Sequence, residues 1–225
     1  MAEQIPPRLI VFDFDGVIAD SEVLACEALA AYAGDLGAPM TWQEAAKLFV
    51  GKRASDEVAT MEALAGRPLP DFLPELERRT FALFEHSLRP IPGVADFIAR
   101  HADIPRCIAS SSSPRRIALC LRVMGLAERF PRGIYSAETV ARGKPFPDIF
   151  LKAAREEGVE PRDAIVIEDS ASGVRAAVAA GMRVIGLLAA SHLPPNHEAE
   201  AALVAAGATF IARDYDEVAR IVDAL

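Results

Sequence analysis

The chain has few of the features that mark secreted, membrane or nucleic-acid-binding proteins. Its 225 residues include only three cysteines, Cys26, Cys107 and Cys120, a scattered set that favours reduced thiols over a disulfide framework. No basic run accompanies the net charge of −8, so we expect neither nucleic acid nor an anionic membrane as a partner. Its apolar stretches are too short to span a bilayer, and the N-terminus lacks the regions of a signal peptide. These absences favour a cytoplasmic protein, which we expect to be a monomer.

The pattern of hydrophobic residues, which make up 52% of the chain, predicts two kinds of segment. Residues 19–88 contain helical patterns and no credible strand. From residue 89 onward, short apolar strands alternate with helices, which is typical of right-handed βαβ units in a parallel sheet. We therefore predict an α/β fold, a doubly wound (Rossmann-like) core of residues 1–18 and 89–225 with an inserted all-helical domain, residues 19–88.

The first predicted strand ends in two carboxylates. Leu9 to Phe12 is an apolar run of the kind that is buried on both faces of a sheet, and Asp13 and Asp15 follow it directly, before Gly16. Unpaired buried charge is costly, so stability alone does not explain these residues. A bound metal ion or a cationic partner would explain them.

Three later connections carry chemistry that complements this pair, and all follow predicted strands, whose carboxyl ends share one edge of a parallel sheet. Ser110 and Ser111 lie in a serine run that ends at Ser113, which can cap a helix opened by Pro114, and this arrangement suggests an anion site. A serine-rich loop with an ordinary helix cap is the alternative. Lys144 also precedes a proline, and a solvated lysine is the alternative. Glu168 and Asp169 end another apolar strand. Acidic strand ends without neighbouring histidine or cysteine point to Mg²⁺.

Taken together, these motifs resemble those of the haloacid dehalogenase superfamily, in the branch of β-phosphoglucomutase and the sugar-phosphate phosphatases. The resemblance spans nearly the whole chain, and its four motifs occur in order: Asp13-Phe14-Asp15-Gly16-Val17, Ser110 within Ala-Ser-Ser-Ser, Lys144-Pro145 and Glu168-Asp169-Ser170. It implies that the helical insert is a mobile cap that closes over the site and excludes water.

The resemblance also implies roles for individual residues. Asp13 would be the nucleophile that forms an aspartyl-phosphate, and Asp15 the general acid and base. Ser110, Lys144 and the amide of Ser111 would bind the phosphate.

The implied metal is Mg²⁺, held by the Asp13 side chain, the Asp15 backbone carbonyl and Asp169, with Glu168 beside it. The implied function is a Mg²⁺-dependent phosphatase acting on a small phosphorylated metabolite, such as a sugar or sugar-acid phosphate.

Two alternatives remain open. A phosphosugar mutase of the β-phosphoglucomutase type would carry a histidine twelve residues after the nucleophile, where this chain has Ala25. A non-enzymatic aspartate phospho-acceptor switch would need neither the helical insert nor the second carboxylate, Asp15.

Outside these motifs the sequence says less. Lys52 and Arg53 fall where related caps place a substrate loop, and we consider them as binding residues, with a solvated turn as the alternative. His192 and His197 lie in a proline-rich stretch, which we interpret as a surface loop.

Overall fold

The computed structural model describes residues 6–50, 54–131, 133–193 and 197–225. It divides into two compact units, one made of Met1–Asp20 with Arg89–Leu225 and the other of Ser21–Leu88.

The first unit is built on a parallel sheet with the strand order β3-β2-β1-β4-β5-β6. The chain moves outward from β1 through β2 to β3 and then returns to the other side of β1, so the strand order reverses at β1. Within the described residues the strands are β1 (Leu9–Phe12), β2 (Arg106–Ser110), β3 (Ile134–Ser136), β4 (Ala164–Glu168), β5 (Arg183–Leu187) and β6 (Phe210–Ala212). Ligands of such sheets bind beyond the strand ends at this reversal point.

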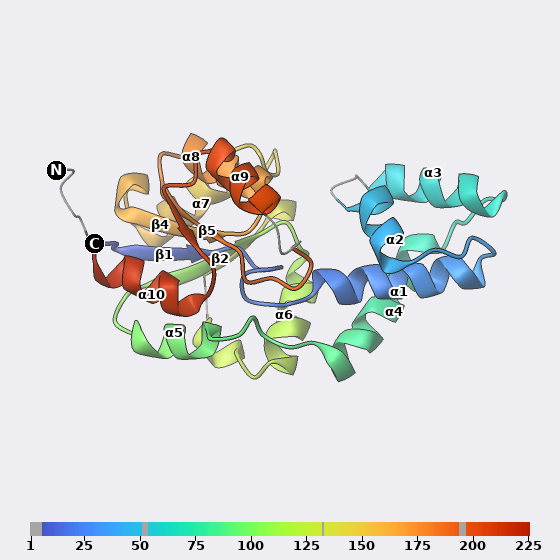
Figure 1. Ribbon diagram of the computed structural model, residues 1–225, viewed down its shortest axis with the longest axis horizontal. Helices are drawn as coiled ribbons and strands as arrows, with labels where there is room; N and C mark the ends of the chain where they lie inside the picture. The colour runs from blue at the N-terminus through green and yellow to red at the C-terminus, as the bar shows by residue number, and fades with distance from the viewer. Residues whose placement is uncertain (1–5, 51–53, 132, 194–196) are drawn as a thin grey trace. The chain divides into compact units, whose positions relative to one another are not determined.

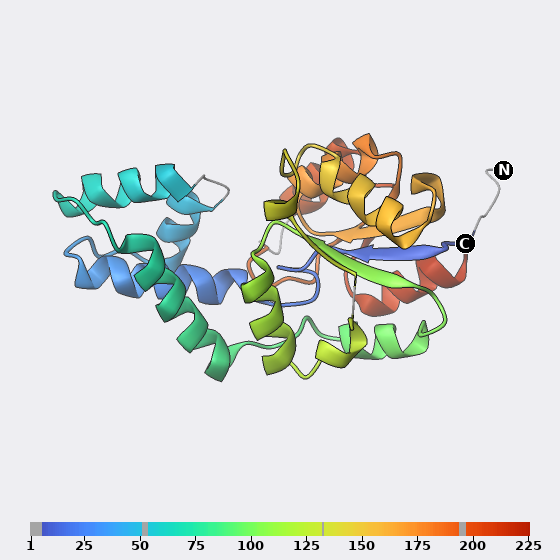
Figure 2. The ribbon, with the colours of Figure 1, turned by 180° about the vertical axis from the view of Figure 1, so that it is seen from behind.

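Helices cover both faces of this sheet, which confirms the predicted doubly wound α/β fold. Figures 1 and 2 show α7, α8 and α9 over one face and α5, α6 and α10 over the other. The bounds of these helices are α5 (Val94–Arg100), α6 (Pro114–Val123), α7 (Asp148–Glu157), α8 (Ala171–Ala179), α9 (His197–Ala206) and α10 (Tyr215–Asp223). Short 3₁₀ turns, η1 (Ala127–Arg129), η2 (Ala137–Thr139) and η3 (Pro161–Asp163), complete this unit.

The central strands are buried because helices pack on both of their faces. Every residue of β1 and β4 is buried, which explains their continuous apolar runs. The ring of Phe12 packs edge-on against Phe97 and Phe130, with centroids 6.1 and 5.8 Å apart. In the sheet register Phe12 pairs with Ile108 of β2 and Ile167 of β4, so the next residue, Asp13, emerges level with the ends of both neighbours.

The second unit consists of helices around a core of its own, and its described residues include no strand. Its helices are α1 (Glu22–Asp35), α2 (Trp42–Phe49), α3 (Ala54–Ala65) and α4 (Phe72–Ser87). Tyr32 stacks on Phe72 at a centroid distance of 5.6 Å, and Met61 is fully buried beside them. A capping box formed by Thr41 and Glu44 begins α2. Across both units, no helix among the described residues is long and apolar enough to cross a membrane.

Candidate active site

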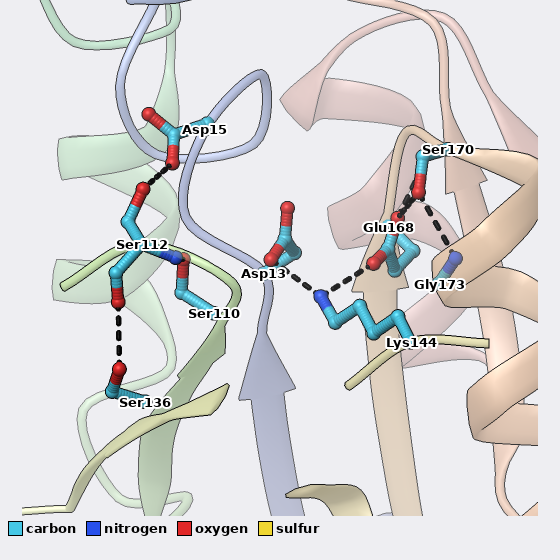
Figure 3. Close-up of polar contacts among 9 residues, drawn as sticks. All are labelled: Asp13, Asp15, Ser110, Ser112, Ser136, Lys144, Glu168, Ser170 and Gly173. Carbon is cyan, nitrogen blue, oxygen red and sulfur yellow. Dashed lines mark hydrogen bonds and ion pairs between the residues drawn. The ribbon is translucent and has the colours of Figure 1, made fainter. Parts of the chain in front are cut away.

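Asp13, Lys144 and Glu168 meet at the carboxyl end of the central strand. The Nζ atom of Lys144 donates to Oδ1 of Asp13 at 2.6 Å and to Oε1 of Glu168 at 2.7 Å (Figure 3). The Lys144 and Glu168 side chains are 7% and 0% exposed, so both ion pairs are shielded from water. A lysine between two buried carboxylates is a charge-assisted arrangement that fixes all three side chains. The structure thus places Lys144 inside the site rather than in solvent.

The first turn of α8 holds Glu168 in place. Its Oε2 accepts hydrogen bonds from the Ser170 backbone N at 2.8 Å and from the Ser170 hydroxyl at 2.9 Å. The same hydroxyl caps α8 by accepting from the Gly173 backbone N. A Cβ atom at Gly173 would lie 1.5 Å from Oε1 of Glu168, so glycine is required for this close approach. Glu168 therefore directs Lys144 toward Asp13.

Burial shifts the charge balance of this cluster. Burial raises the pKa of Asp13 to about 7, although the charge of Lys144 opposes the shift. Burial lowers the pKa of Lys144, but the charges of Asp13 and Glu168 outweigh it, and its pKa lies above the ordinary value. Lys144 is therefore a permanent cation beside a carboxyl that titrates near neutral pH in the metal-free protein.

Asp15 points away from Asp13 and is held by two side chains from the next strand connection (Figure 3). The Ser112 hydroxyl donates to Oδ2 of Asp15 at 2.5 Å, and Nη2 of Arg116 donates to Oδ1 at 2.8 Å. The Arg116 and Asp15 side chains are 22% and 14% exposed. These two hydrogen bonds fix the orientation of the Asp15 carboxylate.

The serine-rich stretch forms a compact turn at the end of β2. Ser110 is buried, and its hydroxyl accepts from the Ser112 backbone N at 3.0 Å. Ser136, at the end of β3, donates to the Ser112 carbonyl at 2.8 Å. Ser113 caps α6 by accepting from the Arg116 backbone N, as its position before a proline suggested. Ser111 is exposed next to this turn.

An acidic cluster beside Asp13 fits a divalent cation. Asp13, Glu168 and Asp169 are all buried, and each offers an oxygen within 4.8 Å of the others. Gly16 makes room for Asp169, because a Cβ atom there would lie only 1.8 Å from its Oδ2. Three buried acidic side chains with one lysine among them favour a further cation, and carboxylate oxygens suit a hard metal ion. The donor set thus fits a metal.

The sequence alone did not point to Ser112, Arg116 or His192 as parts of this region. Ser112 precedes the N-cap of α6 and Arg116 lies in the first turn of that helix, and no local sequence pattern links either residue to Asp15. His192 was interpreted as a surface-loop residue, but its Nε2 lies 3.5 Å from Oδ2 of Asp169. Burial lowers the pKa of His192 below its ordinary value, although nearby carboxylates oppose the shift.

Of the remaining candidates, the structure describes His197 alone. Lys52 and Arg53 lie outside the described residues. His197 is exposed at the first position of α9.

With this geometry in place, comparison with known proteins assigns the family. The model of the haloacid dehalogenase-like hydrolases matches residues 7–181, and the chain belongs to this family of hydrolases. The family resemblance predicted from the four motifs is confirmed, as is the prediction that the chain is an enzyme.

Individual relatives match over most of their length. The chain is 34% identical to protein CbbY of Cereibacter sphaeroides, over 78% of this chain and 82% of that protein. It is 30% identical to a phosphorylated carbohydrates phosphatase of Thermotoga maritima, over 80% of this chain and 84% of the relative. A crystal structure of a HAD family hydrolase from Deinococcus radiodurans, with bound phosphate and sodium, is 34% identical, has a TM-score of 0.81 and covers 98% of this chain and 97% of that one.

Proposed function

We propose that this hydrolase is a Mg²⁺-dependent phosphatase that acts on a small phosphorylated metabolite, such as a sugar or sugar-acid phosphate, through an aspartyl-phosphate on Asp13. The observation that carries the proposal is the position of Asp13, a buried carboxylate at the strand reversal point with Lys144 2.6 Å away. The phosphatase name of the Thermotoga maritima relative supports the reaction, and phosphate bound to the Deinococcus radiodurans hydrolase supports the ligand.

In the first step, an oxygen of Asp13 attacks phosphorus, and the bond from phosphorus to the leaving oxygen breaks. The ammonium group of Lys144, which bonds Asp13, would neutralise charge on both Asp13 and the transferring group. The hydroxyl of Ser110 and the backbone N–H of Ser111 would bind the remaining phosphoryl oxygens at the end of β2. These residues together orient the phosphoryl group and stabilise its charge.

Asp15 would move the protons. It protonates the leaving oxygen and later accepts a proton from the water that attacks the phosphorus of the aspartyl-phosphate, which releases phosphate and restores Asp13. An ion pair with arginine favours the ionised carboxylate, which has no proton to donate, so the contact between Asp15 and Arg116 has to open before proton donation. In this proposal, the Asp15 side chain is bound by Arg116 before the reaction and rotates toward the substrate during it.

Mg²⁺ would be held by the side chains of Asp13 and Asp169 and by the backbone carbonyl of Asp15, with Glu168 beside them. When bound, it supplies positive charge that keeps the carboxylates ionised and offsets the charge of the phosphoryl group. The helical unit, Ser21–Leu88, would serve as the cap that excludes water and selects the substrate, with Lys52 and Arg53 in its substrate loop.

A mutase of the β-phosphoglucomutase type is the alternative activity. Ala25 has no side chain that could take part in proton transfer, whereas the resemblance places a histidine there in the mutases, and this favours water as the phosphoryl acceptor.

A screen of phosphorylated metabolites with Mg²⁺ tests the proposal. Free phosphate and phosphosugar isomers are measured in parallel for each compound. Phosphate release from at least one sugar or sugar-acid phosphate supports the phosphatase. Isomerisation without phosphate release would establish a mutase instead, and neither product from any compound would contradict both.

A further inference from the structure

The loop after β5, residues 188–193, brings a histidine to the edge of the acidic cluster. Nε2 of His192 lies 3.5 Å from Oδ2 of Asp169, and the imidazole Cε1 lies 3.1 Å from the position of a Cβ atom at Gly16. The His192 side chain is 27% exposed, yet its Nδ1 is buried and has no hydrogen-bond partner among the described residues. An exposed loop residue would leave both nitrogens to water, so this placement calls for an explanation.

The neighbouring residue, Ser191, anchors the loop to Asp20, in the segment that follows β1. Ser191 donates to Oδ1 of Asp20 twice, from its backbone N at 3.1 Å and from its hydroxyl at 2.8 Å. A turn closed by the Leu193 backbone N and the Ala190 carbonyl, at 3.2 Å, encloses Ser191 and His192. These bonds fix the backbone on both sides of His192, and they aim its ring at Asp169.

The surroundings of the His192 ring favour one of its two neutral tautomers. A neutral imidazole carries one N–H donor and one acceptor nitrogen. With the proton on Nδ1, a buried donor would have no acceptor, and the lone pair of Nε2 would face the carboxylate of Asp169. With the proton on Nε2, that N–H lies beside a carboxylate oxygen, 3.5 Å from Nε2, that can accept it. The second arrangement is favoured because it removes a repulsion and supplies an attraction.

From this geometry we propose that His192 is a positioning residue, which donates from Nε2 to Asp169 and holds that carboxylate in the orientation that binds the metal. The inference rests on the proposed function, because it assigns Asp169 to the Mg²⁺ site. His192 does not ligate the metal in this account. It acts as outer partners of metal ligands do, by restricting the rotation of the ligand, and the loss of such partners typically weakens metal binding by roughly 10- to 100-fold.

The test measures metal binding directly, without turnover. Metal-free protein is titrated with Mg²⁺ by calorimetry and with Mn²⁺ by electron paramagnetic resonance, for wild type and for His192→Phe, which keeps the ring volume without a donor. His192→Gln restores an N–H at a similar reach, and His197→Phe is the control at an exposed position. Circular dichroism melting of each variant checks that it folds.

We expect His192→Phe to bind both metals roughly 10-fold more weakly than wild type. We expect His192→Gln to recover most of this loss and His197→Phe to match wild type. Wild-type affinity in His192→Phe, or equal weakness in the Phe and Gln variants, would overturn the inference and leave the proposed function standing. Asp169→Asn separates the two claims, because unchanged binding in that variant would overturn the metal site and the inference together.

Discussion

Replacing Lys144 with methionine should destabilise the fold, because the buried carboxylates around Lys144 lose their cationic partner. The variant keeps the length of the side chain but removes a cation that bonds Asp13 at 2.6 Å and Glu168 at 2.7 Å, where these side chains are 11% and 0% exposed. Removing one partner from a buried ion pair costs about 3–5 kcal/mol, because the remaining charge is left unpaired. We therefore expect Lys144→Met to lower the free energy of unfolding of the metal-free protein by about that amount at pH 8.

The pH dependence of this loss follows from the pKa of Asp13. Its folded pKa of about 7 lies above its unfolded value, so the folded state binds the extra proton and Asp13 destabilises the fold as the pH rises toward 7. Without Lys144 the folded pKa of Asp13 rises further, and the destabilising range extends above pH 7. Each additional pH unit costs about 1.4 kcal/mol per carboxyl. The difference between variant and wild type should thus be about 1–2 kcal/mol smaller at pH 6 than at pH 8.

Urea unfolding followed by far-ultraviolet circular dichroism measures this difference. Fluorescence would not serve, because the single tryptophan, Trp42, lies in the helical unit and does not report on the sheet. Lys47→Met, at an exposed position of α2, is the control and should change the free energy of unfolding by less than about 0.5 kcal/mol. A loss below about 1 kcal/mol in Lys144→Met at pH 8, or a loss independent of pH, would refute the reasoning.

Two further substitutions test the neighbouring contacts. Gly16→Ala should lower the free energy of unfolding by about 1–2 kcal/mol, because Gly16 has a φ of +77°. The added methyl group should also displace Asp169 and so weaken Mg²⁺ binding in calorimetry. Gly125→Ala, where φ is +69° and the space around the glycine is open, should lower the free energy of unfolding without changing Mg²⁺ binding. If both glycine variants bind Mg²⁺ equally well, Asp169 is not constrained as described. Arg116→Ala should lower the free energy of unfolding by about 1.5–3 kcal/mol, because it removes a hydrogen bond between two charged groups, Arg116 and Asp15. Arg122→Ala, exposed near the end of the same helix, should change it by less than about 0.5 kcal/mol, and equal losses in the two would contradict the pairing.

Much of the fold could be predicted because its signals are local. The apolar runs at β1 and β4 are buried on both faces, and their alternation with helical patterns indicates a parallel sheet. Parallel strands place their carboxyl ends at one edge, so the sequence alone predicts that Asp13, Glu168 and Asp169 meet there. The Ser113 cap of α6 followed from the proline after it.

The contacts that could not be predicted join side chains from segments that are far apart in the sequence. Arg116 and Ser112 bond Asp15 across 101 and 97 residues of chain, and nothing in their local sequence specifies that partner. His192 reaches Asp169 because Ser191 is anchored on Asp20, a contact between segments 171 residues apart. Sequence periodicity describes which face a residue occupies, but these contacts depend on how loops cross the end of the sheet.

The central claim is that Asp13 is the nucleophile, and turnover of an aryl phosphate by Asp13→Asn tests it most directly. The amide keeps the size of the carboxylate and a contact for Lys144, so the variant should fold, as circular dichroism can verify. Phosphate release with Mg²⁺ is then compared with wild type at equal protein concentration. The account predicts that turnover is abolished in the folded variant. Appreciable Mg²⁺-dependent turnover by folded Asp13→Asn would contradict it.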